Sequence, residues 1–506
     1  MERSNGKVVI GIIIIVFLVF AISIGIAIFN LNYVITITPR SKVAENTDNV
    51  YHRSNFDFNN ENIRDYVKID PNSPNNYEKL EHDDEESIGD RKSKKCSILI
   101  AGDTYIAPNI VREYTHGGGL YTIMDEVFID AIDNSDFFVA NLETSITDRN
   151  TFDVTKEYSL KQSPDELHVL DSLGVDLFAT ANNHSLDFGS DALADTWQYL
   201  DYIGVHTFGS GKNEEDARKP FRITINGVRV AIFNATSIVP KDGWKASDNN
   251  RGVYYLSDPY KYIVPEIRRL KEENKIDKAI VFLHWGKELD ELPTTIQVNQ
   301  AHNLIHGGAD LVVGAHPHIP QTIEYYEGKP IVYSLGNFLF GKNILKQLAV
   351  IQIEFDLIEG ESKLKVIPGT GWWNTTKAYK YEERQFCFDK YVQTSPSDIV
   401  FDEEGYVYER YKLATMSVAE IEDMLIESSD LPIGYEINET SNVDNIAEEI
   451  VKEIASMNEK AYNNDENQDK IQNKDKSNVI SPDKGAPINN TGNKPKPSDY
   501  KSVGPN

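Results

Sequence analysis

The sequence is poor in cysteine and in positive charge. Only Cys96 and Cys387 occur in 506 residues, so a disulfide framework and a cysteine-rich zinc module are both excluded. We interpret the pair as two free thiols, with one long-range disulfide outside the cell as the alternative. Lysine and arginine number 51 against 79 aspartates and glutamates, a net charge of -28. This balance argues against nucleic acid as a partner, because a nucleic-acid-binding face needs clustered positive charge.

Motifs of several common catalytic classes are missing as well. The chain has no Gly-x-Ser-x-Gly elbow, no Walker loop and no His-Glu-x-x-His motif. Gly209-Ser-Gly211 begins like a dinucleotide fingerprint, but Glu214 occupies the third glycine position. These absences leave few reaction classes, and the remaining polar motifs must indicate the chemistry.

One long apolar run lies near the N-terminus. Val8–Phe29 contains 22 uncharged residues, which as a helix span about 33 Å, enough to cross a bilayer. The run is long for a signal peptide and no small-x-small cleavage site follows it, so it predicts an uncleaved signal anchor over residues 8–30. Arg3 and Lys7 favour residues 1–7 in the cytoplasm. The prediction is a single-pass cell-membrane protein with the bulk of the chain extracellular.

Composition divides the rest of the chain into four parts. Residues 31–94 are polar and rich in Asn, Asp, Glu and Ser, which predicts an extracellular stalk. Residues 95–370 alternate apolar and amphipathic stretches and predict the compact domain. Residues 371–462 form a C-terminal extension with helices expected at 416–427 and 444–462. Residues 463–506 have almost no apolar content and predict a disordered tail.

Strand-like runs alternate with helix-like runs in the compact domain. Strands are expected at 97–101, 137–140, 176–179, 228–233, 279–283, 310–313 and 330–333, and helices at 125–134, 164–173, 192–203 and 264–274. This alternation predicts an α/β fold with a largely parallel sheet, whose sites form at the carboxyl ends of the strands. Residues 348–355 and 363–367 are expected to form an antiparallel hairpin, as edge strands of a second layer.

Polar motifs follow these strands. Only 11 histidines occur in the chain, and four of them lie in the motifs, which are Gly102-Asp103, Asn141-Leu-Glu143, Asn182-Asn-His184, His284-Trp-Gly286 and Gly314-Ala-His-Pro-His318. Imidazoles, carboxylates and an amide that converge from several strand ends make a metal site, most plausibly for hydrolysis at phosphorus. A carboxylate such as Glu143 can bridge two metals.

Each motif alone has a plainer interpretation. Asp103 could cap a turn, and His284 could be a hydrogen-bonded core histidine. Asn182-Asn-His184 is as well explained by an Asn-rich turn before a helix as by a ligand beside an acid that Asp187 orients. His316 and His318 are expected in extended geometry with both rings on one side. The ordered series as a whole favours metal over coincidence.

These motifs, together with Ser334-Leu-Gly-Asn-Phe338, resemble in order those of the CapA family, which is named for poly-γ-glutamate capsule synthesis. That family is similar in fold and motif order to the calcineurin-like metallophosphoesterases. The resemblance covers residues 96–340 and implies a layered fold of β-sheets flanked by helices. One departure is Tyr105, since the wider superfamily has a His two residues after the first Asp.

The resemblance also implies roles for individual residues. Asp103 and His318 would bind one metal, Glu143 would bridge, and Asn183, His284 and His316 would bind the second. His184 would be the acid, oriented by Asp187. Two divalent ions are expected, and Mn, Zn or Fe would suit these mixed nitrogen and oxygen ligands.

The predicted function is that of a membrane-anchored, CapA-like protein in the synthesis, export or surface attachment of an anionic polymer such as poly-γ-glutamate. Its expected partners are that polymer and membrane-embedded synthase or export subunits. Two alternatives stay open. One is a metal-dependent phosphatase or phosphodiesterase ectoenzyme with another substrate, and the other is a non-catalytic, polymer-binding accessory subunit.

Overall fold

The structure is a computed structural model that describes residues 63–67, 86–152, 156, 158–341, 347–372 and 374–410. The expected signal anchor, the helices at 416–427 and 444–462 and the tail at 463–506 lie outside the described residues. Within the described ranges, no helix is long and apolar enough to span a bilayer.

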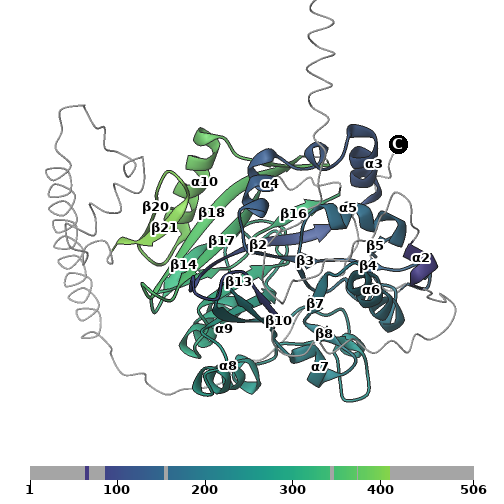
Figure 1. Cartoon of the computed structure of the whole chain (residues 1–506), viewed down its shortest axis with the longest axis horizontal. Coiled ribbons are helices and arrows are strands. Elements are labelled where there is room, and N and C mark those ends of the chain that lie inside the picture. The colour runs from purple at the N-terminus through teal and green to yellow at the C-terminus, as the bar shows by residue number, and fades with distance from the viewer. Residues whose placement is uncertain are drawn as a thin grey trace, which may run out of the picture. The chain divides into compact units, whose positions relative to one another are not determined.

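The described strands form two large sheets, where the sequence predicted one largely parallel sheet (Figure 1). The seven-stranded sheet has the order β1 (Glu86–Ile88), β9 (Phe221–Ile225), β10 (Val228–Thr236), β12 (Lys278–His284), β13 (Leu311–Ala315), β15 (Lys329–Val332) and β14 (Ile323–Tyr326). The ten-stranded sheet has the order β20 (Ile399–Phe401), β21 (Tyr406–Glu409), β18 (Glu361–Trp372), β17 (Leu348–Asp356), β2 (Lys95–Tyr105), β3 (Phe137–Leu142), β6 (Leu177–Ala179) and β7 (His206–Phe208), with β16 (Asn337–Phe340) paired to β2 and β19 (Thr375–Ala378) to β18.

Each sheet has a parallel part that carries the expected strands. In the ten-stranded sheet β2, β3, β6 and β7 pair in parallel, and in the seven-stranded sheet β10, β12, β13 and β15 do so. The predicted hairpin is confirmed by the antiparallel pairing of β17 with β18. Its expected place at the edge of a second layer is wrong, because β17 also pairs with β2 inside the ten-stranded sheet.

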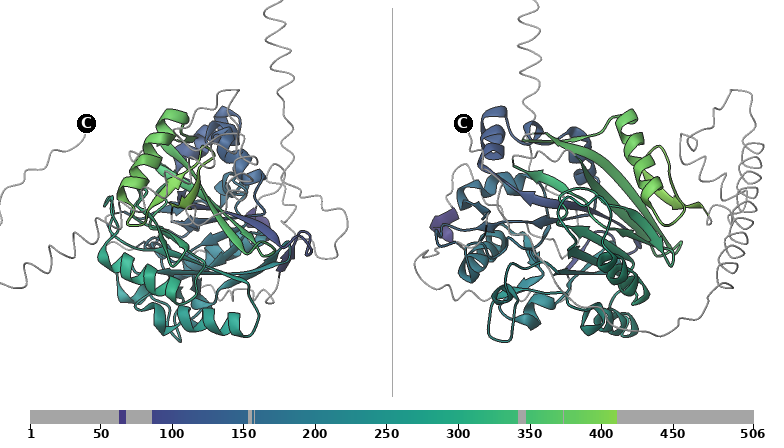
Figure 2. Two further views of the ribbon diagram at one scale, coloured as in Figure 1. Left: turned by 90° about the vertical axis from the view of Figure 1, so that its left-hand side faces the viewer. Right: turned by 180° about the vertical axis from the view of Figure 1, so that it is seen from behind.

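The two sheets pack face to face, and helices cover their outer faces (Figure 2). Along β2, Ile98 and Ile100 enter the core between the sheets, whereas Leu99 and Ala101 pack toward helices. This alternation follows from the two-residue period of a strand. The helices over the ten-stranded sheet include α4 (Glu126–Asp133), α5 (Leu167–Ser172) and α6 (Ser190–Tyr202), and those over the seven-stranded sheet are α8 (Ile263–Glu272) and α9 (Thr295–His306).

Described residues on both sides of the two predicted boundaries contact the sheets and their helices. In the expected stalk, Ile63 on α2 (Ile63–Tyr66) is buried in the core beside α5, and β1 pairs with β9. After residue 370, β19, α10 (Tyr381–Thr394), β20 and β21 join the ten-stranded sheet or pack on it. Short segments that look polar in isolation thus bury apolar side chains against strands distant in sequence, and the boundaries at 94/95 and 370/371 stay a prediction.

Candidate metal centre

The predicted site residues meet where strand ends of the two sheets adjoin. Asp103 lies near the end of β2, and Glu143 directly follows β3. Asn183 and His184 follow β6, His284 is the last residue of β12, and His316 follows β13. Five of the six predicted ligands are buried, with at most 8% of the residue exposed, and the sixth, His318, is partly exposed. The structure thus brings together residues that span more than 200 positions of the sequence.

Glu143 lies at the centre of this cluster. Glu143, His284 and His316 form one group in which one ligand atom from each lies within 4.8 Å of the others, and Asp103, Glu143 and His318 form a second such group. Glu143 Oε1 is 3.6 Å from His284 Nε2, and its Oε2 is 3.9 Å from His318 Nδ1. The two groups share Glu143, which is the division that the family resemblance implies. Whether these residues bind metal stays a prediction.

Three buried atoms of the cluster support a cation as the missing partner. Both carboxylate oxygens of Glu143 and the Nδ1 atom of His316 have no hydrogen-bond partner among the described residues. Glu143 is fully buried, and an unpaired buried carboxylate is strongly unfavourable unless a cation or a proton compensates it. Carboxylate oxygen and imidazole nitrogen are suitable ligands for Mn, Fe or Zn. The donor set therefore fits divalent metal.

The ionisation of the cluster points the same way. Burial, followed by repulsion from Asp103, raises the pKa of Glu143 well above its ordinary value. Burial and then His318 lower the pKa of His316 to about 4, so its ring is neutral and can be a ligand. Burial opposes charge on His318, but Glu143 and Asp103 outweigh it and raise its pKa to about 10. In the absence of metal, the proton on His318 thus balances negative charge of the nearby carboxylates. A metal ion that binds His318 would have to displace this proton.

The His-Pro-His turn differs from its expected form. His316 has φ 95° and His318 has φ 60°, so the extended geometry predicted for this pair is wrong. Both values lie in the left-handed region, which is unfavourable for residues other than glycine. The turn instead places the two ring centroids 6.0 Å apart. It begins after Gly314, where a Cβ atom would lie 2.1 Å from the carbonyl oxygen of Tyr333.

Three asparagines hold the predicted ligands in place. Asn141 Nδ2 donates to Asp103 Oδ1 at 2.8 Å. Asn182 is not directed at the centre, since its amide donates to Asn141 and to the carbonyl of Leu142. Asn337 Oδ1 lies 2.7 Å from His318 Nδ1. The sequence flagged the motifs that contain Asn141 and Asn337 but missed these roles, because the contacts link residues on different strands.

The predicted ligand Asn183 and the predicted acid also lie in the cluster. Asn183 Oδ1 is 2.6 Å from His284 Nε2. His184 turns its Nε2 atom toward Glu143 Oε1, 4.0 Å away, and its Nδ1 atom lies 2.7 Å from Asp187 Oδ2. Lys156, which the sequence did not indicate, contacts the same turn through its ammonium group.

Tyr105 is the residue at which the sequence departs from the resemblance described above. Its ring lies edge-on to Phe340, with centroids 5.6 Å apart, and Phe340 in turn contacts the His318 ring. Burial raises the pKa of Tyr105, so it stays a neutral phenol. An aromatic contact therefore replaces a nitrogen ligand at this position.

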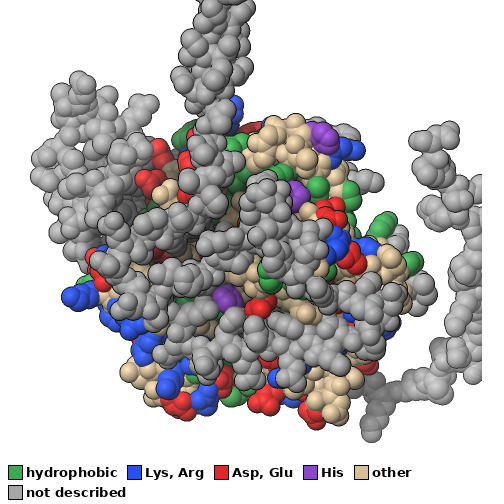
Figure 3. All heavy atoms as spheres, turned by 45° about the vertical axis from the view of Figure 1, so that its right-hand side comes forward, with side chains coloured by type: hydrophobic (Ala, Val, Ile, Leu, Met, Phe, Trp, Pro, Cys, Tyr) green, Lys and Arg blue, Asp and Glu red, His purple; other side chains and the backbone are tan. Residues whose placement is uncertain are grey.

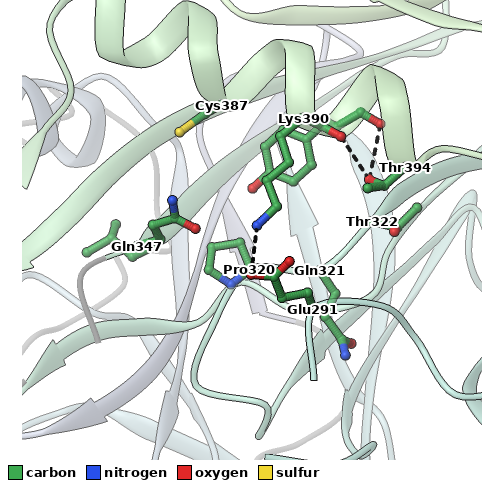
Figure 4. A pocket seen from close by; sticks show the side chains of 10 residues that line it. Glu291, Pro320, Gln321, Thr322, Gln347, Cys387, Lys390 and Thr394 are labelled. Carbon is green, nitrogen blue, oxygen red and sulfur yellow. Dashed lines mark hydrogen bonds and ion pairs between the residues drawn. The ribbon is translucent and has the colours of Figure 1, made fainter. Parts of the chain in front are cut away.

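A separate pocket lies beside the domain's α10 helix (Figure 4). It lies between α10 and the chain that follows the His-Pro-His turn, and Lys390 Nζ is 3.4 Å from Glu291 Oε1 at its rim. None of the predicted site residues lines it.

Cys387 faces this pocket and Cys96 lies on β2. Both are free thiols in the structure, in agreement with the preferred interpretation of the pair.

Comparison with known proteins places these motifs in a family. Residues 97–342 match the family model described as bacterial capsule synthesis protein PGA_cap. The PGA biosynthesis protein CapA of Bacillus subtilis is 31% identical over 46% of this chain and 61% of its own length. A probable polyglutamine synthesis accessory protein of Mycobacterium tuberculosis is 34% identical over 40% of this chain and 55% of its own length. The chain thus spans less than two thirds of either relative.

Solved structures show only a distant likeness. The NAD nucleotidase of Haemophilus influenzae shares 13% identity over 60% of this chain and 63% of its own, with a TM-score of 0.34. The motifs, their order and the family-model match agree, and residues 97–342 belong to the PGA_cap family of bacterial capsule synthesis proteins, the CapA family.

Proposed function

We propose that this chain is a membrane-anchored, outward-facing protein that acts in the synthesis, export or surface attachment of poly-γ-glutamate, through a divalent metal centre. The relatives named for polymer synthesis support the process. The observation that carries the metal centre is Glu143, a fully buried carboxylate without a hydrogen-bond partner among the described residues, shared by two His/carboxylate groups.

The residues around Glu143 define what the centre can do. Asp103, Glu143 and His318 would hold one ion, and Glu143, Asn183, His284 and His316 the other. Divalent ions in such a site supply Lewis acidity and lower the pKa of water. His184 directs Nε2 at the cluster, so the ring protonated at both nitrogens can donate to Asp187 through Nδ1–H and deliver its Nε2 proton to a leaving oxygen. Asp187 keeps the ring in that orientation through Nδ1.

The location and the partners belong to the same proposal. The apolar run at 8–30 supports an anchor that holds the domain at the outer face of the membrane, where a polymer would emerge beside its synthase or export subunits. The overall charge of -28 does not exclude an anionic polymer. On the face shown in Figure 3, Lys and Arg side chains lie among Asp and Glu side chains over the described surface.

A second candidate function is hydrolysis of a phosphate ester on another extracellular substrate. The shared position of Glu143 favours it, because two ions bridged by one carboxylate are the arrangement that clamps the attacking and leaving oxygens of a phosphoryl displacement. An accessory role without turnover is the remaining outcome of the experiment below.

The test compares wild type with His316→Ala, and uses His302→Ala as a matched control. His302 contacts Glu324 and Tyr326, outside the cluster. Metal content is measured on the purified full chain by mass spectrometry. Polymer output is measured in the source bacterium with each variant in place of the native gene, and turnover is measured on nitrophenyl phosphomonoesters and phosphodiesters.

We expect bound metal and polymer in wild type and in His302→Ala, and the loss of both in His316→Ala. Ester turnover with unchanged polymer output in His316→Ala would support the second candidate function. Loss of polymer without measurable turnover would support the accessory role. A wild-type protein without metal, together with full polymer output from His316→Ala, would contradict the metal centre.

A further inference from the structure

Lys156 is a partly buried lysine beside the candidate metal centre. It lies between β4 (Ser145–Ile146) and β5 (Lys161–Gln162), and its side chain is 12% exposed. Its Nζ atom lies 2.7 Å from the carbonyl oxygen of Asn183, 2.5 Å from Asp187 Oδ1 and 3.1 Å from His184 Nδ1. An ammonium group has three N–H donors. Two of them can donate to oxygen atoms of one turn, and the third faces His184 Nδ1.

The surroundings of Lys156 keep this arrangement together. Its ammonium lies 5.1 Å from the ring centre of Trp244, which is buried. Such a position favours the cation through the ring face and keeps water from competing for its hydrogen bonds. The carboxylate of Asp187 also accepts from the backbone N–H of Leu160 at 2.6 Å. The segment after β4 is thereby joined to the turn after β6 at two points.

The His184 ring is held from one side by these groups. Its Nδ1 atom faces both Lys156 Nζ and Asp187 Oδ2, at 3.1 and 2.7 Å. A neutral ring nitrogen carries either a proton or a lone pair, so Nδ1 either donates to Asp187 or accepts from Lys156. Both cases fix the ring in the same place, with Nε2 toward Glu143.

We propose that Lys156 is a positioning residue of the metal centre, which holds the turn of Asn183, His184 and Asp187 in the geometry that the centre requires. The proposal deepens the function proposed above, on which it rests. It also assigns Lys156 a role other than binding an anionic substrate directly, because its donors are directed at the protein.

The test uses the full chain with 15N-labelled histidine. Lys156→Met removes the ammonium, and Lys156→Arg keeps the charge but not the three-donor geometry. Lys161→Met is the matched control, since Lys161 Nζ bonds the carbonyl of Arg149 and the side chain of Asn150. The His184 ring nitrogens are assigned by their loss in His184→Gln. Zn²⁺ affinity is measured by titration, and the fold by circular dichroism.

We expect Lys156→Met to shift the His184 ring nitrogen resonances and to weaken Zn²⁺ binding about 10- to 100-fold, as removal of supporting groups does in metal sites. Lys156→Arg should recover only part of this loss, and Lys161→Met should change neither readout. Wild-type resonances and affinity in Lys156→Met would overturn the proposal. Full recovery in Lys156→Arg would also overturn it, since charge alone would then suffice.

Two further outcomes are separated by this design. If wild type binds no Zn²⁺, the proposed metal centre fails, whereas the His184 resonances still decide whether Lys156 positions the ring. If Lys156→Met does not fold, Lys156→Gln replaces it, because a glutamine is polar but has no charge and is too short to reach the three atoms that the ammonium contacts. Unchanged His184 resonances in a folded Lys156→Gln protein would then overturn the proposal.

Discussion

Glu143→Gln tests the central feature of the metal centre, and two effects of opposite sign are expected. In metal-free wild type at pH 7.5, the buried Glu143 either holds a proton against its ordinary pKa or stays charged without a partner. An unsatisfied buried group of this kind costs about 1–3 kcal/mol. A neutral glutamine avoids the charge, so metal-free Glu143→Gln should unfold at the same temperature as metal-free wild type or a few degrees above it.

The rise in Tm on metal addition should occur in wild type and be almost absent in Glu143→Gln. A ligand that binds only the folded state stabilises it by about 2.7 kcal/mol at 100 times its Kd, which corresponds to a rise of about 5–10 °C in Tm for a domain of 150–250 residues and to somewhat less for this longer one. Wild type should show this rise on addition of Mn²⁺ or Zn²⁺, whereas Glu143→Gln should show almost none. Differential scanning fluorimetry measures both effects.

The matched control is Glu324→Gln. Glu324 is also a buried carboxylate, but it is paired with His302 and Tyr333. Its substitution should lower the Tm of the metal-free protein and leave the rise on metal addition unchanged. A metal-free Glu143→Gln protein that is destabilised by more than about 2 kcal/mol, or one that keeps the full metal response, would refute the role assigned to Glu143.

Three further predictions follow from contacts around the site and in the core. Asn337→Ala removes the partner of His318 Nδ1 and should weaken metal binding about 10- to 100-fold, measured by titration, with little change in metal-free Tm. Although burial opposes it, Lys271 and a second lysine lower the pKa of Asp310 below 3.8, so its stabilisation is present above about pH 3.8 and lost as the pH falls through the folded-state pKa. Asp310→Asn should therefore cost about 1–3 kcal/mol in urea unfolding at pH 7, and the difference from wild type should shrink below pH 3.8. Gly314→Ala places a methyl group 2.1 Å from a backbone oxygen, and a loss of at least 1–3 kcal/mol is expected from the same assay; an unchanged unfolding midpoint would contradict that close approach.

The strands and the candidate residues could be predicted from the sequence because both are local signals. Apolar runs such as 137–140 and 279–283 became β3 and β12, since a strand buried on both faces needs a continuous apolar run. Each polar motif directly followed such a run, so its place at a strand end was determined by chain order alone. The family resemblance depended on the same short motifs.

The division of those strands into two sheets could not be predicted from local patterns. A buried strand of one sheet has the same composition as a buried strand of another, and which strands pair is decided by packing between segments distant in sequence. The same reason explains why β1 and β21 were not predicted as strands, since both are too short to be distinguished from polar connections before their partners are known.

The sequence by itself determined which residue types would be available at the strand ends, and hence that histidines, carboxylates and an amide would supply the chemistry. Only the tertiary structure decided that Glu143 belongs to both groups of candidate ligands, that His316 and His318 take left-handed backbone conformations and that Lys156 meets the turn of His184. The physical reason is that side-chain identity is a property of one position, whereas a buried charge acquires its partners only when two packed sheets bring distant strand ends together.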